Sequence, residues 1–495
     1  MTESRRRAVA IIGAGVQGLA AARTLVELGY QVRIFEKLDG IGGTWHEKKS
    51  YPGLASHGPM KNLFYPDFPG PAGFDENKPF AREDFVAYLE SYARHFRLLD
   101  LISFGCRVEE IRHDPGKPLL VKARDADGRT IEHACDYVVY TTFTTIGFVP
   151  RFPGDETFPG RIVHASDLNG GVLETAIRKG ERILVLGGNK SAADVVTYLE
   201  SRSYKNYLWV FRRNTWGSDY DSITAGSMTL RLGFYAYYRI FRSRRLRPLA
   251  GAAFLPLRLF GYFISPFPES HPLDVGYNGA VWRKEQVAVL RRSRFHRGEI
   301  ARIDGRNVRL AVRGAPPGHD EVRDAFDLIV CGTSFVQTKD ARIILSAAGA
   351  ERPLDQEKSD FLFRSMIHPS APRIVFWNAA ISPGRITLSS YLLSLWFHRH
   401  FRSLEEGACD PAAMTAEIDD DRRMVRENAI PDYSVWKTFQ KAQGLFIEKN
   451  SGLTLKDLGL YDTRTRLILL SASPADLKEI YLRKLAEMKT VGPPS

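Results

Sequence analysis

The sequence predicts an α/β fold with two dinucleotide-binding domains. Two stretches of the chain, beginning at residues 8 and 182, each read as a strand, a glycine-rich turn, a helix and a second strand. In both stretches the apolar run of the first strand leads directly into the turn. We therefore expect two Rossmann-like domains, one inserted into the other, followed by a helical C-terminal segment.

The first stretch is a complete βαβ unit. An apolar strand at 8–12 runs into the turn G-A-G-V-Q-G at 13–18, and a helical pattern over Leu19–Leu28 follows. A second apolar strand at 31–35 ends on the acid Glu36. Because strand, turn, helix and acid have the order and spacing of a dinucleotide site, we interpret the motif as more than an ordinary glycine-rich turn.

The glycines and the acid of this unit have separate roles. Gly13 permits the tight turn, Gly15 lets the backbone approach a pyrophosphate, and Gly18 allows the helix to pack closely on the strand. The phosphates then lie at the positive end of the helix. Glu36 can accept from ribose hydroxyls and repels a 2′-phosphate, so the site suits FAD or NAD rather than NADP.

The second stretch repeats this pattern with a change of charge. A strand at 183–186 leads into the turn at 187–192, and the strand at 207–211 ends on Arg212 and Arg213. Arginine at this place suits a 2′-phosphate, which favours NADPH; the less favoured alternative is that the pair only caps the strand in solvent. Asn189 replaces the second glycine, and its side chain crowds the approach of a phosphate.

Two further apolar strands, 137–142 and 328–333, end in threonine-containing turns and mark crossings between the domains. The expected domains are therefore an FAD-binding domain in two parts, an inserted NADPH-binding domain and a C-terminal helical segment. Their bounds are 1–169 and 326–400 for FAD, 170–325 for NADPH, and 401–495 for the helical segment. Helices are expected at 411–428, with Asp410 as N-cap, and at 474–488.

The segment 228–266 is aromatic and apolar around a cluster of arginines. Three interpretations remain open: it lies on a membrane surface, it covers a hydrophobic substrate pocket, or it forms a helical pair with its arginines in solvent. The chain contains no uninterrupted apolar stretch of about 18 residues, so we expect no transmembrane helix. Arg5–Arg7 before the first apolar run resembles a signal peptide, but that run is already the first strand, so we expect a cytoplasmic protein.

Composition restricts the partners. The formal charge of +12 attracts anions, but the basic residues are scattered and no nucleic-acid module accompanies them, so we expect no nucleic-acid partner. The four cysteines lie far apart without a C-x-x-C pair, which disfavours both structural disulfides and a disulfide reductase. Because no cluster has metal-ligand spacing, we expect no metal site.

Together these motifs resemble the flavin-containing monooxygenases, a family that includes Baeyer–Villiger and N-hydroxylating enzymes. The resemblance extends over most of residues 8 to 400, and its most diagnostic part is a linker motif F-x-G-x-x-x-H. Four residues after its histidine, Leu168 stands where an aromatic residue is expected. The remaining motifs are Gly43-Thr44-Trp45, Y-P-G-L at 51–54, Y-P-D-F-P at 65–69, the linker residues Phe158, Gly160 and His164, G-G-N-K-S-A-A-D at 187–194, and Gly332-Thr333.

The resemblance implies that NADPH reduces FAD, that O2 adds at flavin C4a, and that the resulting hydroperoxide oxygenates a small hydrophobic molecule. His164 is then expected to order the linker between the domains. The residues expected to bind the cofactors are Gly13, Gly15, Gly18, Glu36, Lys37, Gly43, Thr44, Trp45, Val108, Gly187, Asn189, Lys190, Ser191, Arg212, Arg213 and Thr333.

The type of oxygenation depends on His57, the candidate catalytic residue. Baeyer–Villiger enzymes carry aspartate at this place, and heteroatom-oxidising relatives carry asparagine near it. We expect oxygenation at nitrogen or sulfur, with Baeyer–Villiger oxygenation of a ketone as the alternative, and His57 as a merely structural histidine also remains open. Asn189 and the turn 141–143 further motivate an oxidase or dehydrogenase without productive NADPH use, and a non-catalytic FAD-bound scaffold is the last interpretation.

Overall fold

The fold is described from a computed structural model of the chain. The described residues are 6–56, 60, 63–70, 75, 78–141, 144–169, 171–212, 215–219, 276–312, 321–338, 341–347, 350–354, 362–364, 366–377, 386–427, 461–462, 467–468 and 474–490. His57, Arg213 and the segment 228–266 lie outside them. Within the described residues, no helix is both long and apolar enough to cross a membrane.

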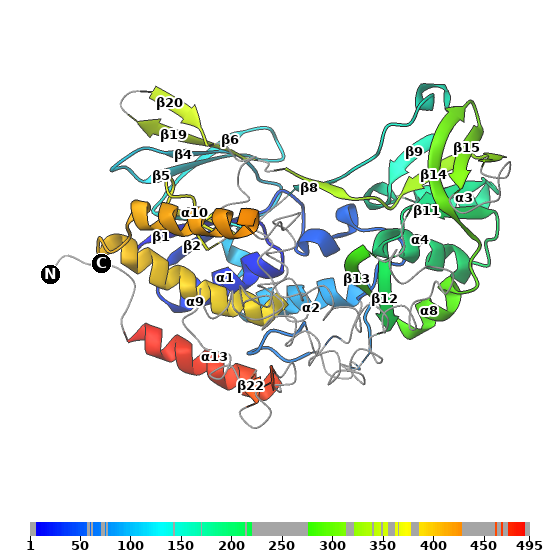
Figure 1. The fold of residues 1–495 in the computed structure, drawn as a ribbon. Helices are drawn as coiled ribbons and strands as arrows, with labels where there is room; N and C mark the ends of the chain where they lie inside the picture. The colour runs from blue at the N-terminus through cyan, green and yellow to red at the C-terminus, as the bar shows by residue number, and fades with distance from the viewer. Residues whose placement is uncertain are drawn as a thin grey trace.

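The described chain forms two lobes joined by a narrow linker (Figure 1). The first lobe is built on a parallel sheet of order β21-β7-β1-β2-β3. Its strands are β1 (Ala8–Ile12), β2 (Gln31–Phe35), β3 (Ile102–Ser103), β7 (Tyr137–Tyr140) and β21 (Ile374–Phe376). The predicted bounds of the first two strands are confirmed, because strands buried on both faces appear in the sequence as continuous apolar runs.

This sheet is the middle of three layers. Val9 and Ile11 of β1 face a core shared with helices, whereas Ala10 and Ile12 face a second sheet. The helices are α1 (Val16–Glu27), α2 (Arg82–His95) and α9 (Ile386–Glu405). The second sheet has the order β20-β19-β4-β5-β6, with strands β4 (Arg107–His113), β5 (Leu119–Arg124), β6 (Thr130–Cys135), β19 (Arg342–Ala347) and β20 (Ala350–Pro353). Nothing in the sequence analysis predicted this sheet.

The second lobe contains a seven-stranded sheet of order β16-β15-β14-β11-β10-β17-β9. Its strands are β9 (Arg161–His164), β10 (Ile183–Leu186), β11 (Tyr207–Phe211), β14 (Phe295–Asp304), β15 (Asn307–Val312), β16 (Glu321–Ala325) and β17 (Leu328–Cys331). Helices α3 (Val172–Arg178), α4 (Lys190–Ser201) and α8 (Lys284–Leu290) contribute to the apolar core on one face. Beside it, β12 (Thr215–Asp219) pairs with β13 (Gly276–Trp282).

The seven-stranded sheet extends beyond the predicted insertion 170–325 on both sides. Strand β9 comes before that range and β17 after it, yet both pair in parallel register within this sheet. The linker between the lobes consists of two crossings of the chain. The chain leaves the first lobe as β8 (Thr144–Gly147) and returns to it as β18 (Phe335–Thr338). These two strands form an antiparallel pair, and Figure 1 shows the crossing between the two lobes at the label β8.

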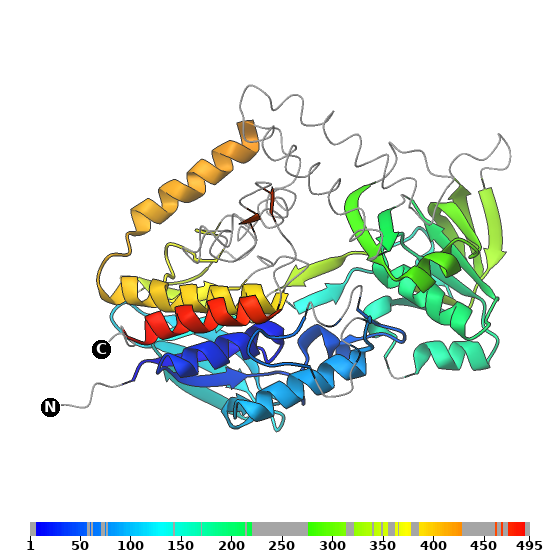
Figure 2. The same ribbon diagram turned by 90° about the horizontal axis from the view of Figure 1, so that it is seen from below.

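The C-terminal helices pack on the first lobe. Helix α13 (Pro474–Lys489) lies beside α9, which in turn packs on α1, and Figure 2 shows this layer. Helix α10 (Pro411–Glu427) points away from it in the same view. The predicted cap of α10 is confirmed, because Asp410 Oδ1 accepts from the Ala412 N–H at 2.8 Å. A short hairpin, β22 (Tyr461–Asp462) with β23 (Leu467–Ile468), completes the described part of this region.

Buried tyrosines hold α13 in place. The Tyr481 ring stacks on Tyr391 of α9 with centroids 4.2 Å apart, and its hydroxyl lies 3.1 Å from Thr24 Oγ1 of α1. Tyr391 stacks in turn on Tyr65, and the Tyr391 hydroxyl donates to Asp67. Burial raises the pKa of Asp67, while the bond from Tyr391 works in the opposite direction.

Replacing Tyr481 tests this anchoring. Tyr481→Ala removes a fully buried ring, so we expect the free energy of unfolding to fall by about 3–5 kcal/mol. Tyr481→Phe keeps the stack and loses the hydroxyl contact with Thr24, so the loss should be about 1 kcal/mol. Denaturant titration of both variants measures the difference, and equal losses would contradict the role of the stacked ring.

Candidate functional site

The first glycine-rich turn is shaped by contacts between backbone atoms. Gly13 has φ of 105°, and its N–H donates to the Phe35 carbonyl at 2.8 Å. A Cβ atom on Gly18 would lie 1.9 Å from the Gly13 carbonyl oxygen, so only glycine fits there. Helix α1 can therefore begin directly against the end of β1, at Val16 rather than at the predicted Leu19.

Gly15 is different, because the protein itself does not require a glycine there. Its φ is −86°, and the nearest heavy atom to an added Cβ would be the Gly43 Cα at 3.6 Å, an ordinary contact distance. Gly15 is the N-cap of α1, where backbone N–H groups are free to bind an anion. The open space at Gly15 is the feature expected if a pyrophosphate lies against this backbone.

Glu36 closes this cradle from the end of β2. The carboxylate is 4% exposed, and its two oxygens accept from the N–H groups of Ala14 at 2.7 Å and Leu38 at 2.8 Å. An ionised carboxylate can accept about four hydrogen bonds, so lone pairs remain for ribose hydroxyls. The residues present therefore fit an FAD molecule, with Glu36 also fixing the turn.

Of the other residues expected at this cradle, some lie beside it, whereas Val108 lies in the core between the two sheets. The helical turn η1 (Gly43–Trp45) lies against it, because the Gly42 N–H donates to the Ala14 carbonyl at 3.4 Å. The half-buried Trp45 ring packs on Phe80 and Phe85, whereas Thr44 is exposed. Lys37 follows Glu36 directly. Val108 points into the core between the two sheets of the first lobe, next to an irregularity in the pairing of β4 with β5.

The second cradle lies at the carboxyl ends of β10 and β17. Gly187 has φ of 121°, and a Cβ there would lie 2.3 Å from the Gly332 carbonyl oxygen. A Cβ on Gly332 would lie 2.6 Å from atoms of Ala192 in α4. The indole N–H of Trp209 donates to the Gly187 carbonyl at 2.7 Å, which fixes the turn. Both glycines are thus required by contacts within the protein.

Asn189 is the N-cap of α4, and its Oδ1 accepts from the Lys190 N–H at 2.8 Å. The side chain therefore occupies one of the backbone donors that a phosphate would use. At the end of β11, Arg212 is exposed and lies 3.9 Å from Glu299 of β14. Sequence reasoning did not identify Glu299, whose carboxylate would compete with a phosphate for Arg212.

Lys190 does not point into solvent. Its ammonium pairs with Asp194, whose side chain is fully buried. Burial lowers the pKa of Lys190, while the Asp194 carboxylate raises it. Asp194 also accepts from the Tyr51 hydroxyl at 2.9 Å and from the Gln286 amide at 2.8 Å. Sequence analysis included Tyr51 and Asp194 in two separate motifs, but no pattern in either motif indicated that they touch.

The linker histidine joins β9 to both linker strands. His164 Nε2 lies 3.3 Å from the Thr333 carbonyl, and the ring packs edge-on against Phe335 at 4.6 Å. A Cβ on Gly147 would lie 2.1 Å from this ring. Burial lowers the pKa of His164, although its contact with the Thr333 carbonyl works in the opposite direction. Thr333 thus lies beside the second sheet and the linker.

The rest of the linker motif serves packing. Phe158 packs into the apolar cluster on one face of the second sheet. A Cβ on Gly160 would lie 2.1 Å from the Asp327 carbonyl, so glycine lets the chain enter β9 close to β17.

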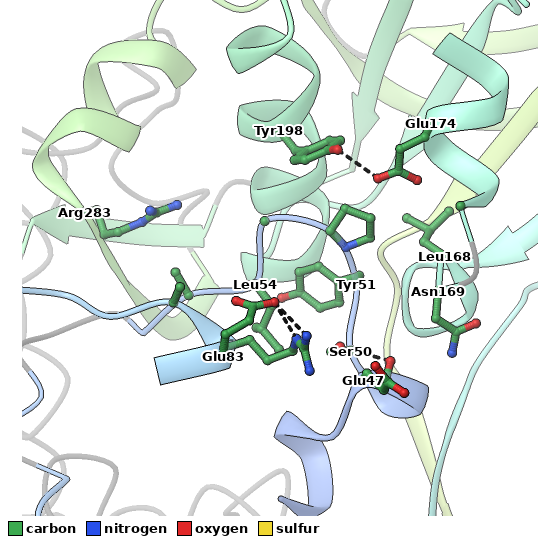
Figure 3. A pocket seen from close by; sticks show the side chains of 16 residues that line it. Glu47, Ser50, Tyr51, Leu54, Glu83, Leu168, Asn169, Glu174, Tyr198 and Arg283 are labelled. Atoms are coloured by element: carbon green, nitrogen blue, oxygen red, sulfur yellow. Dashed lines mark hydrogen bonds and ion pairs between the residues drawn. The ribbon is translucent and has the colours of Figure 1, made fainter. Parts of the chain in front are cut away.

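A groove of about 530 Å³ runs between the lobes. The loop from Glu47 to Ala55 forms one wall, and Leu168, Glu174, Tyr198 and Arg283 belong to the other lobe or its approach (Figure 3). The Tyr198 hydroxyl donates to Glu174 at 2.8 Å across the top of the view. The 47–55 loop lies directly against the second lobe beside this groove, where the Tyr51 hydroxyl donates to Asp194.

The structure thus assembles the predicted residues into two separate cradles. Gly13, Gly15, Gly18, Glu36 and Gly43 meet in the first lobe, while Gly187, Asn189, Lys190, Ser191 and Thr333 lie at one end of the second sheet. Thr141 was not predicted as a site residue, but its hydroxyl donates to the Ile12 carbonyl at 2.6 Å beside the first turn. Residues 57 and 213 are outside the described chain.

Comparison with known proteins shows which proteins the chain resembles. Residues 6–222 match the family of flavin-binding monooxygenase-like proteins. The chain is 31% identical to a probable flavin-containing monooxygenase 1 of Arabidopsis thaliana over 312 residues, which cover 55% of this chain and 56% of that protein. It is 29% identical to the senecionine N-oxygenase of Tyria jacobaeae over 214 residues, covering 40% and 45%. The chain thus spans about half the length of the curated relatives it matches.

A solved structure shows the same fold at low identity. The polycyclic ketone monooxygenase of the thermophilic fungus Thermothelomyces thermophila superposes with a TM-score of 0.62 at 15% identity, over 99% of this chain and 90% of that one. The predicted α/β fold with two Rossmann-like parts and the predicted family resemblance are both confirmed.

Alanine at two of the glycines separates ligand binding from folding. Gly15→Ala should weaken FAD binding at least about tenfold, because the added methyl group occupies the pyrophosphate approach. The FAD-free protein should lose only about 1 kcal/mol of stability, since alanine is a poorer N-cap. Gly18→Ala should cost about 3 kcal/mol, because its Cβ meets the Gly13 carbonyl.

FAD titration and denaturant unfolding of the FAD-free variants measure the two effects. Wild-type FAD affinity in Gly15→Ala would contradict the placement of the pyrophosphate.

Proposed function

Since residues 6–222 match the flavin-binding monooxygenase-like family, we propose that the chain is an FAD- and NADPH-dependent monooxygenase. FAD binds in the first lobe and NADPH in the second, and each lobe is one cofactor domain. The substrate is a small hydrophobic molecule that is oxygenated at nitrogen or sulfur with oxygen from O2.

The observation that carries the proposal is the difference in charge between two similar cradles. Both place a glycine turn and a helix N-terminus at the carboxyl ends of parallel strands, where nucleotides bind in such folds. The second strand of the first cradle ends on Glu36, which repels a 2′-phosphate. The corresponding strand of the second cradle ends on Arg212, which attracts one. One protein with both cradles suits FAD together with NADPH.

The protein positions the cofactors and excludes water from them. When bound, FAD would supply the redox chemistry that links the oxidation of NADPH to the use of O2. The turn at Gly13–Gly18 and the start of α1 bind its pyrophosphate, and Glu36 binds its ribose. Trp45, packed on Phe80, holds the η1 turn against this cradle. In the second lobe the N-terminus of α4 binds phosphate, and Arg212 selects NADPH.

Oxygenation of a heteroatom is favoured over Baeyer–Villiger oxygenation by the relatives in sequence. One of them is named an N-oxygenase, whereas the similarity to a ketone monooxygenase is one of fold at 15% identity. We propose His57 as the residue beside the flavin that takes the place of the aspartate or asparagine of relatives. A tertiary amine, a thioether and a cyclic ketone as test substrates separate the two reactions, and oxygenation of the ketone alone would contradict our preference.

Anaerobic mixing with NADPH tests the function directly. We expect the purified protein to contain FAD and the visible absorbance of its flavin to bleach with NADPH. On readmission of O2, NADPH consumption should rise in the presence of substrate. A flavin that NADPH leaves oxidised would exclude the monooxygenase and favour an oxidase or dehydrogenase.

Arg212 and Glu299 should set the preference for NADPH. Arg212→Gln removes the positive partner of the 2′-phosphate, so the ratio of kcat/KM for NADPH to that for NADH should fall about tenfold. Glu299→Gln removes a competing carboxylate 3.9 Å away and should raise the same ratio. Steady-state kinetics with both nucleotides measure it, and an unchanged ratio in both variants would show that Arg212 only caps the strand.

A further inference from the structure

We propose that Tyr51 and Asp194 form a latch that sets the position of the nicotinamide lobe over the flavin lobe, with Lys190 as its counter-ion rather than a phosphate ligand. The interlobe latch consists of Tyr51, Asp194, Lys190 and Gln286. This inference rests on the proposed function for its catalytic consequence, but the latch itself is a feature of the protein alone.

Tyr51 is a first-lobe residue inserted into the second lobe. It belongs to the loop 47–55, and its ring packs against the apolar core that contains Val195 and Leu199 of α4. The neighbouring Gly53 reinforces the contact, because a Cβ there would lie 3.3 Å from the Tyr198 ring. The loop thus approaches α4 closely enough that its position and that of the second lobe are coupled.

Asp194 is the acceptor on which the latch depends. Its side chain is fully buried, and both oxygens are used: Oδ2 by the Tyr51 hydroxyl, and Oδ1 by Lys190 and the Gln286 amide. Gln286 is 1% exposed and comes from α8, so the carboxylate joins three separate elements. A buried carboxylate needs this many donors, and it holds each of them in a narrow geometry.

The same burial argues against a direct role for Lys190 on phosphate. Removing the ammonium from Asp194 would leave a buried carboxylate without a cation, which is strongly unfavourable. The Lys190 side chain is also only 13% exposed, so little of its surface is open to a ligand. The phosphate is therefore left to the backbone N–H groups at the start of α4 and to Arg212. Lys190 is a positioning residue that acts through Asp194.

The latch has a consequence for hydride transfer. The two rings of a hydride donor and acceptor must meet at near-contact distance, and a displacement of about 1 Å can cost a factor of about 100 in rate. The rings are held by different lobes under the proposed function. A hydrogen bond across the lobes therefore affects the rate of flavin reduction without contributing to nucleotide affinity.

Tyr51→Phe is the main test, with Tyr198→Phe as its matched control. Both variants remove one tyrosine hydroxyl on the same groove, but Tyr198 donates to Glu174 within the second lobe. Hydrogen–deuterium exchange of the protein without nucleotide is read at the loop 50–56 and the first turns of α4. We expect exchange there to rise at least about fivefold in Tyr51→Phe and to stay unchanged in Tyr198→Phe.

Flavin reduction by saturating NADPH gives the second readout. The limiting rate constant should fall about tenfold in Tyr51→Phe, since a hydrogen bond to a charged acceptor is worth at least that factor. The Kd of NADP⁺, measured by calorimetry, should change less than about twofold. Wild-type exchange and wild-type reduction in Tyr51→Phe would overturn the latch.

Lys190→Met tests the counter-ion role separately. Loss of a phosphate ligand would weaken NADP⁺ binding by about tenfold or more and make it less dependent on salt. We expect instead a small change in Kd with faster exchange in the loop 50–56, matching Tyr51→Phe. Should Lys190→Met fail to fold, the NADP⁺ Kd and its salt dependence are measured in Lys190→Gln, whose amide can still donate to Asp194 but carries no charge. Weaker and less salt-dependent binding there would place residue 190 on the phosphate.

The outcomes separate this inference from the proposed function. If NADPH leaves the wild-type flavin oxidised while exchange still responds to Tyr51→Phe, the function fails and the latch stands. If NADPH reduces the flavin normally in every variant, the function stands and the latch has no role in positioning.

Discussion

The closeness of backbone to backbone at two glycine turns is the constraint on which this protein depends. In the first lobe no side-chain atom fits between Gly18 and the Gly13 carbonyl, and in the second none fits between Gly187 and the Gly332 carbonyl. The Gly18–Gly13 contact, together with that of Gly332 with Ala192 of α4, brings a helix N-terminus to the carboxyl ends of parallel strands. The unpaired N–H groups of α1 and α4 are therefore presented at defined positions, and the acid or arginine at the next strand end decides which dinucleotide suits each position.

The two turns are not equivalent. Their difference separates the glycines that contacts within the protein require from the glycine that a bound ligand would require. Gly13, Gly18, Gly187 and Gly332 are explained by contacts within the chain. Gly15 is not, because a methyl group there would meet only Gly43 at an ordinary distance. In the second lobe the equivalent place is Asn189, whose side chain returns to the helix it caps. The first cradle is thus open toward a ligand, and the second is partly filled by its own side chain.

Much of this could be predicted from the sequence, for a physical reason. Strands buried on both faces are continuous apolar runs, so β1, β2, β10 and β11 were placed at their observed bounds. The sheet β20-β19-β4-β5-β6 was missed because strands such as β6, with alternating exposed and half-buried residues, have no comparable signal. The pairing of β9 with β17 and the contact of Tyr51 with Asp194 join residues more than 140 positions apart, and local pattern carries no information about such contacts.

The paired crossing β8–β18 has a mechanical consequence. A ribbon of two hydrogen-bonded strands bends readily out of its plane, but shear within the plane must break its hydrogen bonds. The paired strands that join the lobes are therefore flexible in one direction, out of the plane of the pair, and stiff in the other two. His164, wedged against Gly147 and Phe335, lies at the end of that pair. Bending of this pair would change the distance between the lobes, whereas sliding of one strand along the other would break the hydrogen bonds of the pair.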